Sequence, residues 1–133
     1  MKAVLLIGLP GSGKTYIAQT DYVSRGYILV DDPTDLDEVR AGVATALAGG
    51  NPGVVVCDPH LTRAGTRAIA LQVFPALGCT EVECVYFEND PVKAARNLQH
   101  RADSRGHISV EVFSRQYEIP AGVVPRDIWQ PEI

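Results

Sequence analysis

The sequence predicts a three-layer α/β sandwich in which helices cover both faces of a mostly parallel sheet. Segments of strand character alternate with segments of helical spacing along the chain, a pattern typical of parallel strands joined by right-handed crossovers. Residues 3–7 and 54–57 are apolar without interruption, as expected of strands that are buried on both faces. Such sheets bind ligands at the carboxyl ends of their strands, so functional residues are expected there.

Four strands and five helices are expected. The strands fall at 3–7, 27–30, 54–58 and 82–87. The helices fall at about 14–24, 35–48, 62–74, 91–101 and 110–117. The last strand alternates acidic and apolar residues, so it is expected near an edge of the sheet. Residues 119–133 contain three prolines and are expected to form an extended tail. Trp129 in this tail either packs on the domain as a clasp, which is favoured, or stacks on the acceptor.

Capping and breaking residues set the ends of these helices. Thr34 and Ser109 are the expected N-caps of the second and the last helix, because a hydroxyl oxygen can accept a bond from a free N–H group of the first turn. Gly26 ends the first helix, and Pro75 and Gly78 close the third.

Length and composition indicate a single domain that spans residues 1–133. The chain is 46% hydrophobic and 21% charged, which is ordinary for a globular protein with one core. Its net charge of −4 argues against tight, sequence-independent binding to nucleic acid, which requires many cations. The apolar run at 3–9 is far shorter than the roughly 20 residues that span a bilayer, so a cytoplasmic protein without membrane contact is expected.

A phosphate-binding loop stands between the first strand and the first helix. Its sequence is GLPGSGKT, which matches the G-x-x-x-x-G-K-[ST] motif. The glycines let the backbone aim N–H groups at the β- and γ-phosphates, while Lys14 contributes a cation and Thr15 a ligand to Mg²⁺. ATP and Mg²⁺ are therefore the expected cofactors. The expected nucleotide-binding residues of this loop are Gly8, Pro10, Gly11, Ser12, Gly13, Lys14 and Thr15.

Carboxylates end two of the predicted strands. Asp58 follows an apolar strand, where a carboxylate can hold Mg²⁺ directly or through water. Asp31 and Asp32 end another strand, close to the expected position of an acceptor hydroxyl. One of them, with Asp31 favoured over Asp32, is expected to receive the hydroxyl proton or to align the hydroxyl. Helix capping by Asp58 and turn chemistry in Asp-Asp-Pro are the structural alternatives.

Arginines form a second group of candidates. Arg96, Arg101 and Arg105 have the spacing of a helix end and a following loop, so they can fold over a nucleotide as a short Arg-rich lid. Guanidinium groups there would neutralise charge on the transferred phosphoryl group. A solvated helix face is the alternative.

Residues after Asp58 are candidates for binding the acceptor. His60, Arg63 and Arg67 follow that carboxylate and could hold the acceptor. Arg63 and Arg67 are four residues apart, which also fits the exposed face of an ordinary helix.

These motifs together resemble the 5′-hydroxyl kinase domain of bacteriophage polynucleotide kinase, from residue 1 to about 117. The resemblance rests on GLPGSGKT, the Asp31–Asp32 pair, Val-Val-Cys before Asp58, and Arg96-Asn97 followed by Arg101 and Arg105. It implies an adenylate-kinase-like P-loop NTPase fold, with ATP as donor and Lys14 and Thr15 on phosphate and metal. It also implies Asp31 as the base, Arg96 and Arg105 on the phosphates, and, for a phage-encoded protein, the host cytoplasm as location.

Two departures from that family concern the acceptor. Thr34 stands where the family has an arginine that grips the acceptor's phosphate, and the stretch between the Asp pair and the next strand is much shorter. Three acceptors therefore remain open: a 5′-hydroxyl end, a hydroxymethyl group on a pyrimidine base of phage DNA, or a free nucleotide. No obligatory protein partner is implied.

A nucleotide-dependent switch is the competing hypothesis. A GTPase switch requires an Asn-Lys-x-Asp motif, which the sequence lacks. Its Asp-x-x-Gly motif occurs only at Asp103–Gly106, within the Arg-rich segment and not after a strand. Acceptor-dependent consumption of ATP distinguishes a kinase from such a switch.

Overall fold

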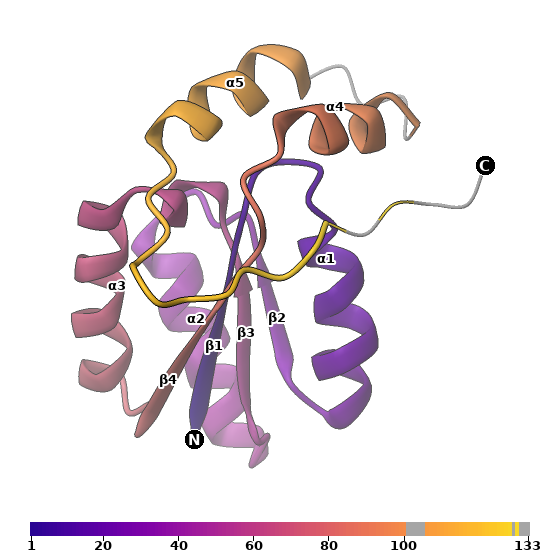
Figure 1. Ribbon diagram of the computed structural model, residues 1–133. Coiled ribbons are helices and arrows are strands. Elements are labelled where there is room, and N and C mark those ends of the chain that lie inside the picture. Colours follow the sequence, from indigo (N-terminus) through magenta and orange to yellow (C-terminus); the bar gives the residue numbers. More distant parts are fainter. Residues whose placement is uncertain (101–105, 129, 131–133) are drawn as a thin grey trace.

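The protein folds around a parallel four-stranded sheet. The computed structural model describes residues 1–100, 106–128 and 130. Its strands are β1 (Lys2–Ile7), β2 (Ile28–Asp31), β3 (Gly53–Cys57) and β4 (Glu81–Tyr86). Their order in the sheet is β2-β3-β1-β4, and the three neighbouring pairs are all parallel (Figure 1). The predicted parallel sheet is confirmed, and β4 lies at an edge as expected.

Helices cover both faces of this sheet. The covering helices are α1 (Lys14–Ile17), α2 (Leu36–Gly49) and α3 (Ala64–Ala76), and two further helices are α4 (Pro91–His100) and α5 (Gly106–Gln116). Alternate residues of β1 point to opposite faces. Leu5 belongs to the core cluster that holds Val43 of α2 and Phe74 of α3, whereas Leu6 belongs to a second cluster with Ile17 of α1. This gives the three layers of the predicted sandwich.

Two helices lie outside the layers. In Figure 1, α4 and α5 lie beyond the carboxyl ends of the strands, on the side where the phosphate-loop segment leaves β1.

Among the described residues, no helix has the length and apolar character needed to cross a membrane.

The segment after the phosphate loop is less regular than the predicted helix. Four α-helical residues lead into a π-helical turn, Ala18–Tyr22, and then a 3₁₀ turn, Val23–Arg25. The hydroxyls of Thr20 and Ser24 donate to carbonyls four residues earlier, at 3.0 and 2.7 Å. Such side-chain bonds compete with the regular helical pattern. Gly26 ends the run with φ 95°, as predicted.

Both predicted N-caps are shifted. The N-cap of α2 is Asp35, whose carboxylate accepts from Glu38 N at 3.0 Å. Thr34 lies one residue earlier and donates to Glu38 from its hydroxyl and its backbone N–H, at 2.8 and 3.1 Å. Glu38 therefore bonds to both residues that precede the helix: its carboxylate accepts from Thr34, and its backbone N–H donates to Asp35. In the last helix, α5 begins at Gly106, three residues before Ser109.

The predicted third helix is two separate elements. A 3₁₀ turn, η3 (Pro59–Thr62), precedes α3, and Arg63 between them is extended with φ −85° and ψ 130°. The prediction that Pro75 closes the helix is wrong, because Pro75 lies inside its last turn. Leu77 N still reaches Val73 O at 3.1 Å, so the turn holds.

The C-terminal tail is partly integrated into the fold. Arg126 pairs in parallel with Phe87 after β4, with Arg126 N bonded to Tyr86 O at 2.7 Å and Glu88 N to Arg126 O at 2.8 Å. The side chain of Ile128 is buried in the main core. The tail is therefore extended, as predicted, and it also adds contacts to the edge of the sheet. Trp129 lies outside the described residues.

Tyr117 joins this region to the start of the phosphate loop. Its buried hydroxyl lies 3.0 Å from Ile7 O and 2.5 Å from Phe87 O. Burial raises the pKa of the phenol above its usual value, so the group stays neutral and donates. Tyr117 thus fixes the ends of β1 and β4, next to the point where the glycine-rich loop begins.

We expect Tyr117→Phe to lower the free energy of unfolding by about 1–2 kcal/mol, because the carbonyl oxygen of Phe87 loses the Tyr117 hydroxyl as its donor. Urea denaturation measures the change. Val124→Ala, at a side chain that is 92% exposed, serves as control and should change stability by no more than about 0.5 kcal/mol. Equal stability of Tyr117→Phe and the wild type would contradict the anchoring role.

Candidate functional site

The phosphate loop has the backbone form that anion binding needs. Gly11 and Gly13 have φ 85° and 88°, a region that side chains with a Cβ rarely occupy. Ser12 N bonds back to Leu9 O at 3.1 Å. The following helix has no side-chain cap at its N-terminus and no acid in its first turn. Its N–H groups are therefore available for a phosphate.

Helix α4 packs directly on this loop. A Cβ at Gly11 would lie 2.3 Å from the backbone oxygen of Ala94 and 2.9 Å from the side chain of Leu98. Asn97, a buried residue of α4, donates from Nδ2 to Gly11 O at 2.8 Å. Asn97 belongs to the Arg-Asn motif, but no role for it was predicted. The structure places it as the residue that ties α4 to the loop.

Lys14 lies inside the loop and is almost fully buried. Its ammonium donates to Gly8 O at 2.8 Å and Leu9 O at 2.7 Å, and it lies 3.4 Å from Ser12 Oγ. Burial lowers the pKa of Lys14 to about 8, although nearby acidic groups act in the opposite direction. The loop therefore holds the Lys14 ammonium at its centre.

The predicted carboxylates lie at the carboxyl ends of β2 and β3, beside this loop. Asp31 is the last residue of β2, and its Oδ1 lies 3.5 Å from Thr15 Oγ1. Asp32 has φ 46°, and its backbone N–H bonds to Cys57 O at 2.7 Å. This bond holds the turn after β2 against the end of β3, so that Asp32 comes close to Asp58.

Asp58 sits at the start of η3 and forms a compact pair with His60. Its Oδ1 accepts from His60 N at 2.9 Å and lies 2.8 Å from His60 Nδ1. Ligand atoms of Asp32, Asp58 and His60 all lie within 4.8 Å of one another. The sequence paired Asp58 with Thr15 as metal ligands. The structure groups Asp58 with Asp32 and His60, and Thr15 with Asp31.

The two arginines after His60 have different surroundings. Arg63 is exposed at the start of α3. The structural alternative, in which Arg67 lies on an exposed helix face, is wrong, because Arg67 is 6% exposed and donates to the carbonyls of Leu61 and Thr62 at 3.0 and 2.9 Å. Helical spacing indicates a shared face but does not say whether that face is covered.

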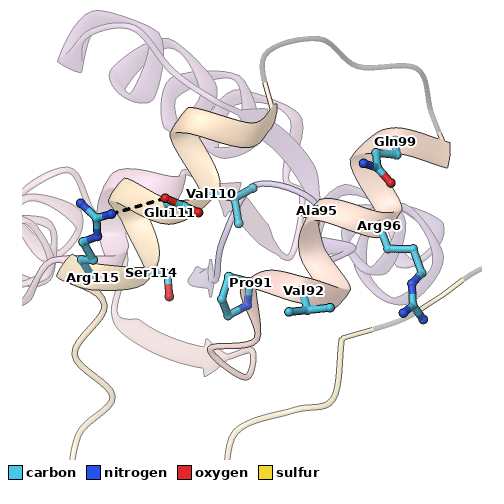
Figure 2. A pocket seen from close by; sticks show the side chains of 9 residues that line it. All are labelled: Pro91, Val92, Ala95, Arg96, Gln99, Val110, Glu111, Ser114 and Arg115. Atoms are coloured by element: carbon cyan, nitrogen blue, oxygen red, sulfur yellow. Dashed lines mark hydrogen bonds and ion pairs between the residues drawn. The ribbon is translucent and has the colours of Figure 1, made fainter.

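The predicted lid is described only at its first arginine. Arg96 lies on α4, whereas Arg101 and Arg105 lie outside the described residues. A groove of about 650 Å³ separates α4 from α5. Figure 2 shows Arg96 extending from α4 away from α5, while Arg115 on the other helix pairs with Glu111 at 3.4 Å.

Comparisons with solved structures show which fold this is. The chain matches a gluconokinase from Sinorhizobium meliloti 1021 with a TM-score of 0.56 and 16% identity, over 98% of this chain and 84% of that one. It also matches a structure titled APE1195 with a TM-score of 0.55 and 20% identity, over 96% and 84%. The protein has a P-loop NTPase fold. At these identities the likeness establishes the fold alone.

Sequence comparison adds one viral relative. The chain is 28% identical over 120 residues to the uncharacterized protein R277 of Acanthamoeba polyphaga mimivirus, covering 87% of this chain and 86% of that protein. No protein-family model matches the chain.

The low pKa of Lys14 predicts a pH dependence of nucleotide binding. Above pH 8 the free protein loses the ammonium proton, so the affinity for Mg·ATP should fall about fivefold between pH 8 and 9. Titration with a fluorescent ATP analogue from pH 7 to 9.5 measures it. Lys14→Met, which has no proton to lose, should bind weakly at every pH. A wild-type affinity that stays constant over this range would contradict the assignment.

Proposed function

We propose that this protein is a kinase that transfers the γ-phosphoryl group of Mg·ATP to a hydroxyl group. One observation carries the proposal: the candidate proton acceptor and the phosphate loop are neighbours, with Asp31 Oδ1 3.5 Å from the hydroxyl of Thr15. The P-loop NTPase fold, which the protein shares with a gluconokinase structure, supports it. An acceptor hydroxyl near Asp31 would therefore lie beside the nucleotide's phosphates.

The residues of the phosphate loop and of the neighbouring strand ends suit both predicted cofactors, ATP and Mg²⁺. Phosphates require free N–H groups and a cation, which the uncapped N-terminus of α1 and Lys14 offer. Mg²⁺ prefers oxygen ligands, and the two predicted ligands, Thr15 and Asp58, present a hydroxyl and a carboxylate oxygen here. When bound, Mg²⁺ would neutralise negative charge on the phosphates.

The side chains have distinct parts in the transfer. As the acceptor oxygen forms its bond to the γ-phosphorus, the bond from that phosphorus to the β-γ bridging oxygen breaks, and ADP leaves. Asp31 takes the proton of the acceptor hydroxyl, while Asp32 aligns that hydroxyl from the adjoining turn. Lys14 stabilises charge on the transferred group, and Arg96 and Arg105 are proposed to do so from the lid. Arg101 is proposed to bind the nucleotide.

We propose a nucleic-acid hydroxyl as the acceptor, at a 5′ end as in polynucleotide kinase. The motif resemblance supports this choice, and His60 and Arg63 would contact the acceptor from the β3–α3 connection. A hydroxymethyl pyrimidine base or a free nucleotide is the alternative, because Thr34 is engaged with Glu38 at 2.8 Å and offers no cation to a phosphate. A nucleotide-dependent switch is the non-kinase alternative.

Transfer of label from γ-labelled ATP tests the proposal. The acceptors are a 5′-hydroxyl oligonucleotide, a hydroxymethylated duplex with blocked ends, and a pool of nucleoside monophosphates. We expect label on the oligonucleotide, with a loss of about 10²-fold or more in Lys14→Ala and in Asp31→Asn. Label on another acceptor would confirm the kinase and replace the 5′-end assignment.

Glu81→Gln is the matched control, because Glu81 is exposed at the opposite end of the sheet and should leave transfer unchanged. ATP that is bound and slowly hydrolysed, with no label on any of the three acceptors, would contradict the kinase proposal and favour the switch.

A further inference from the structure

Arg67 is a buried charged residue that the proposed mechanism does not use. Its side chain reaches from α3 to η3, the turn that begins next to Asp58. There its Nη1 donates to two successive carbonyl oxygens, Leu61 O at 3.0 Å and Thr62 O at 2.9 Å. The guanidinium also lies 5.3 Å from the ring centroid of Tyr86 in β4. Arg67 therefore links α3, η3 and β4 in the interior.

The turn that Arg67 holds is braced from several sides. Thr62 is fully buried, and its hydroxyl donates to Pro59 O at 2.8 Å. Thr62 O also accepts from Glu118 N at 3.1 Å. At the other end of the turn, the ring of His60 contacts that of Phe113 in α5 edge to face, with centroids 5.4 Å apart. These contacts leave little freedom to the five residues from 58 to 62.

Stability alone gives a weak reason for a charge at this place. Removing a guanidinium from water is costly, and replacing a buried ionic group by an apolar side chain of similar size is often neutral or stabilising. A charge that donates two bonds to one turn instead determines the position of that turn. The functional atoms carried there are the Asp58 carboxylate and the His60 ring, which lie 2.8 Å apart.

We propose that Arg67 is a positioning residue that sets the place of Asp58 relative to the phosphate loop. The inference rests on the proposed kinase function, in which Asp58 contributes to the Mg²⁺ site. Arg67 touches neither nucleotide nor acceptor. It acts through the carbonyls of Leu61 and Thr62, as residues behind metal ligands do when they orient those ligands.

The test compares Arg67→Met, Arg67→Lys and the control Arg25→Met. Arg25 also donates to a backbone carbonyl, Asp21 O at 2.6 Å, and lies over the rings of Tyr22 and Tyr27, but it belongs to the turn before β2. For each variant the readouts are urea stability, affinity for a fluorescent ATP analogue, the kcat of label transfer, and the Mg²⁺ concentration that gives half-maximal transfer.

We expect Arg67→Met to bind the ATP analogue within about twofold of the wild type, because the phosphate loop is untouched. Its kcat should fall about tenfold or more, and the half-saturating Mg²⁺ concentration should rise by a similar factor. Arg67→Lys, which keeps a donor, should recover part of the loss. In an Asp58→Asn background, Arg67→Met should cause little further loss, since both changes act on one ligand. Arg25→Met should resemble the wild type.

Three results would overturn the inference. The first is unchanged transfer and Mg²⁺ dependence in Arg67→Met. The second is an equal loss of ATP affinity and transfer together with lower stability in both Arg67 variants, which a purely structural role predicts. The third is full additivity with Asp58→Asn. A wild-type protein that labels no acceptor would overturn the proposed function itself, and so is distinguishable from these outcomes.

Discussion

The close approach of α4 to Gly11 is the constraint on which the rest of the site depends. The Ala94 carbonyl oxygen lies 2.3 Å from the position that a Cβ at Gly11 would take. Asn97 of the same helix donates to the carbonyl oxygen of Gly11. Helix α4 and the loop are therefore positioned against each other. Because Arg96 precedes Asn97 on that helix, the same packing sets the position of Arg96 relative to the loop.

The site concentrates opposite charges in a small space. Lys14 is buried in the loop. Asp31, Asp32 and Asp58 lie at the carboxyl ends of two adjacent strands, β2 and β3. These acids act against the desolvation that lowers the pKa of Lys14. A cation within the loop and carboxylates beside it suit a reaction in which phosphate charge is held on one side and a proton is taken up on the other. Parallel pairing of β2 with β3 brings Asp31 and Asp32 to the same end of the sheet as Asp58.

Local sequence signals predicted the fold and the phosphate loop, because strands, glycine turns and helices are encoded by adjacent residues. The positions of Asp31 and Asp58 at strand ends followed from the same signals. Contacts between distant segments could not be predicted in this way. Asn97 meets Gly11 across 86 positions, and the proximity of Asp32 to His60 depends on the β2–β3 register. Arg67 lies over the ring of Tyr86, which is 19 positions away in β4. In the cap of α2, Asp35 accepts from the Glu38 N–H while Thr34 donates to the Glu38 carboxylate, so both residues take part.

A crystal structure with a non-hydrolysable ATP analogue and Mn²⁺ tests the central claim most directly, because the anomalous signal of Mn²⁺ locates the metal. The account predicts the triphosphate within the loop at 8–15, the ammonium of Lys14 on its terminal phosphates, and Mn²⁺ beside Thr15 on the side of Asp31 and Asp58. Mn²⁺ bound by Asp32 and His60 away from any nucleotide, with the loop free of phosphate, would contradict it.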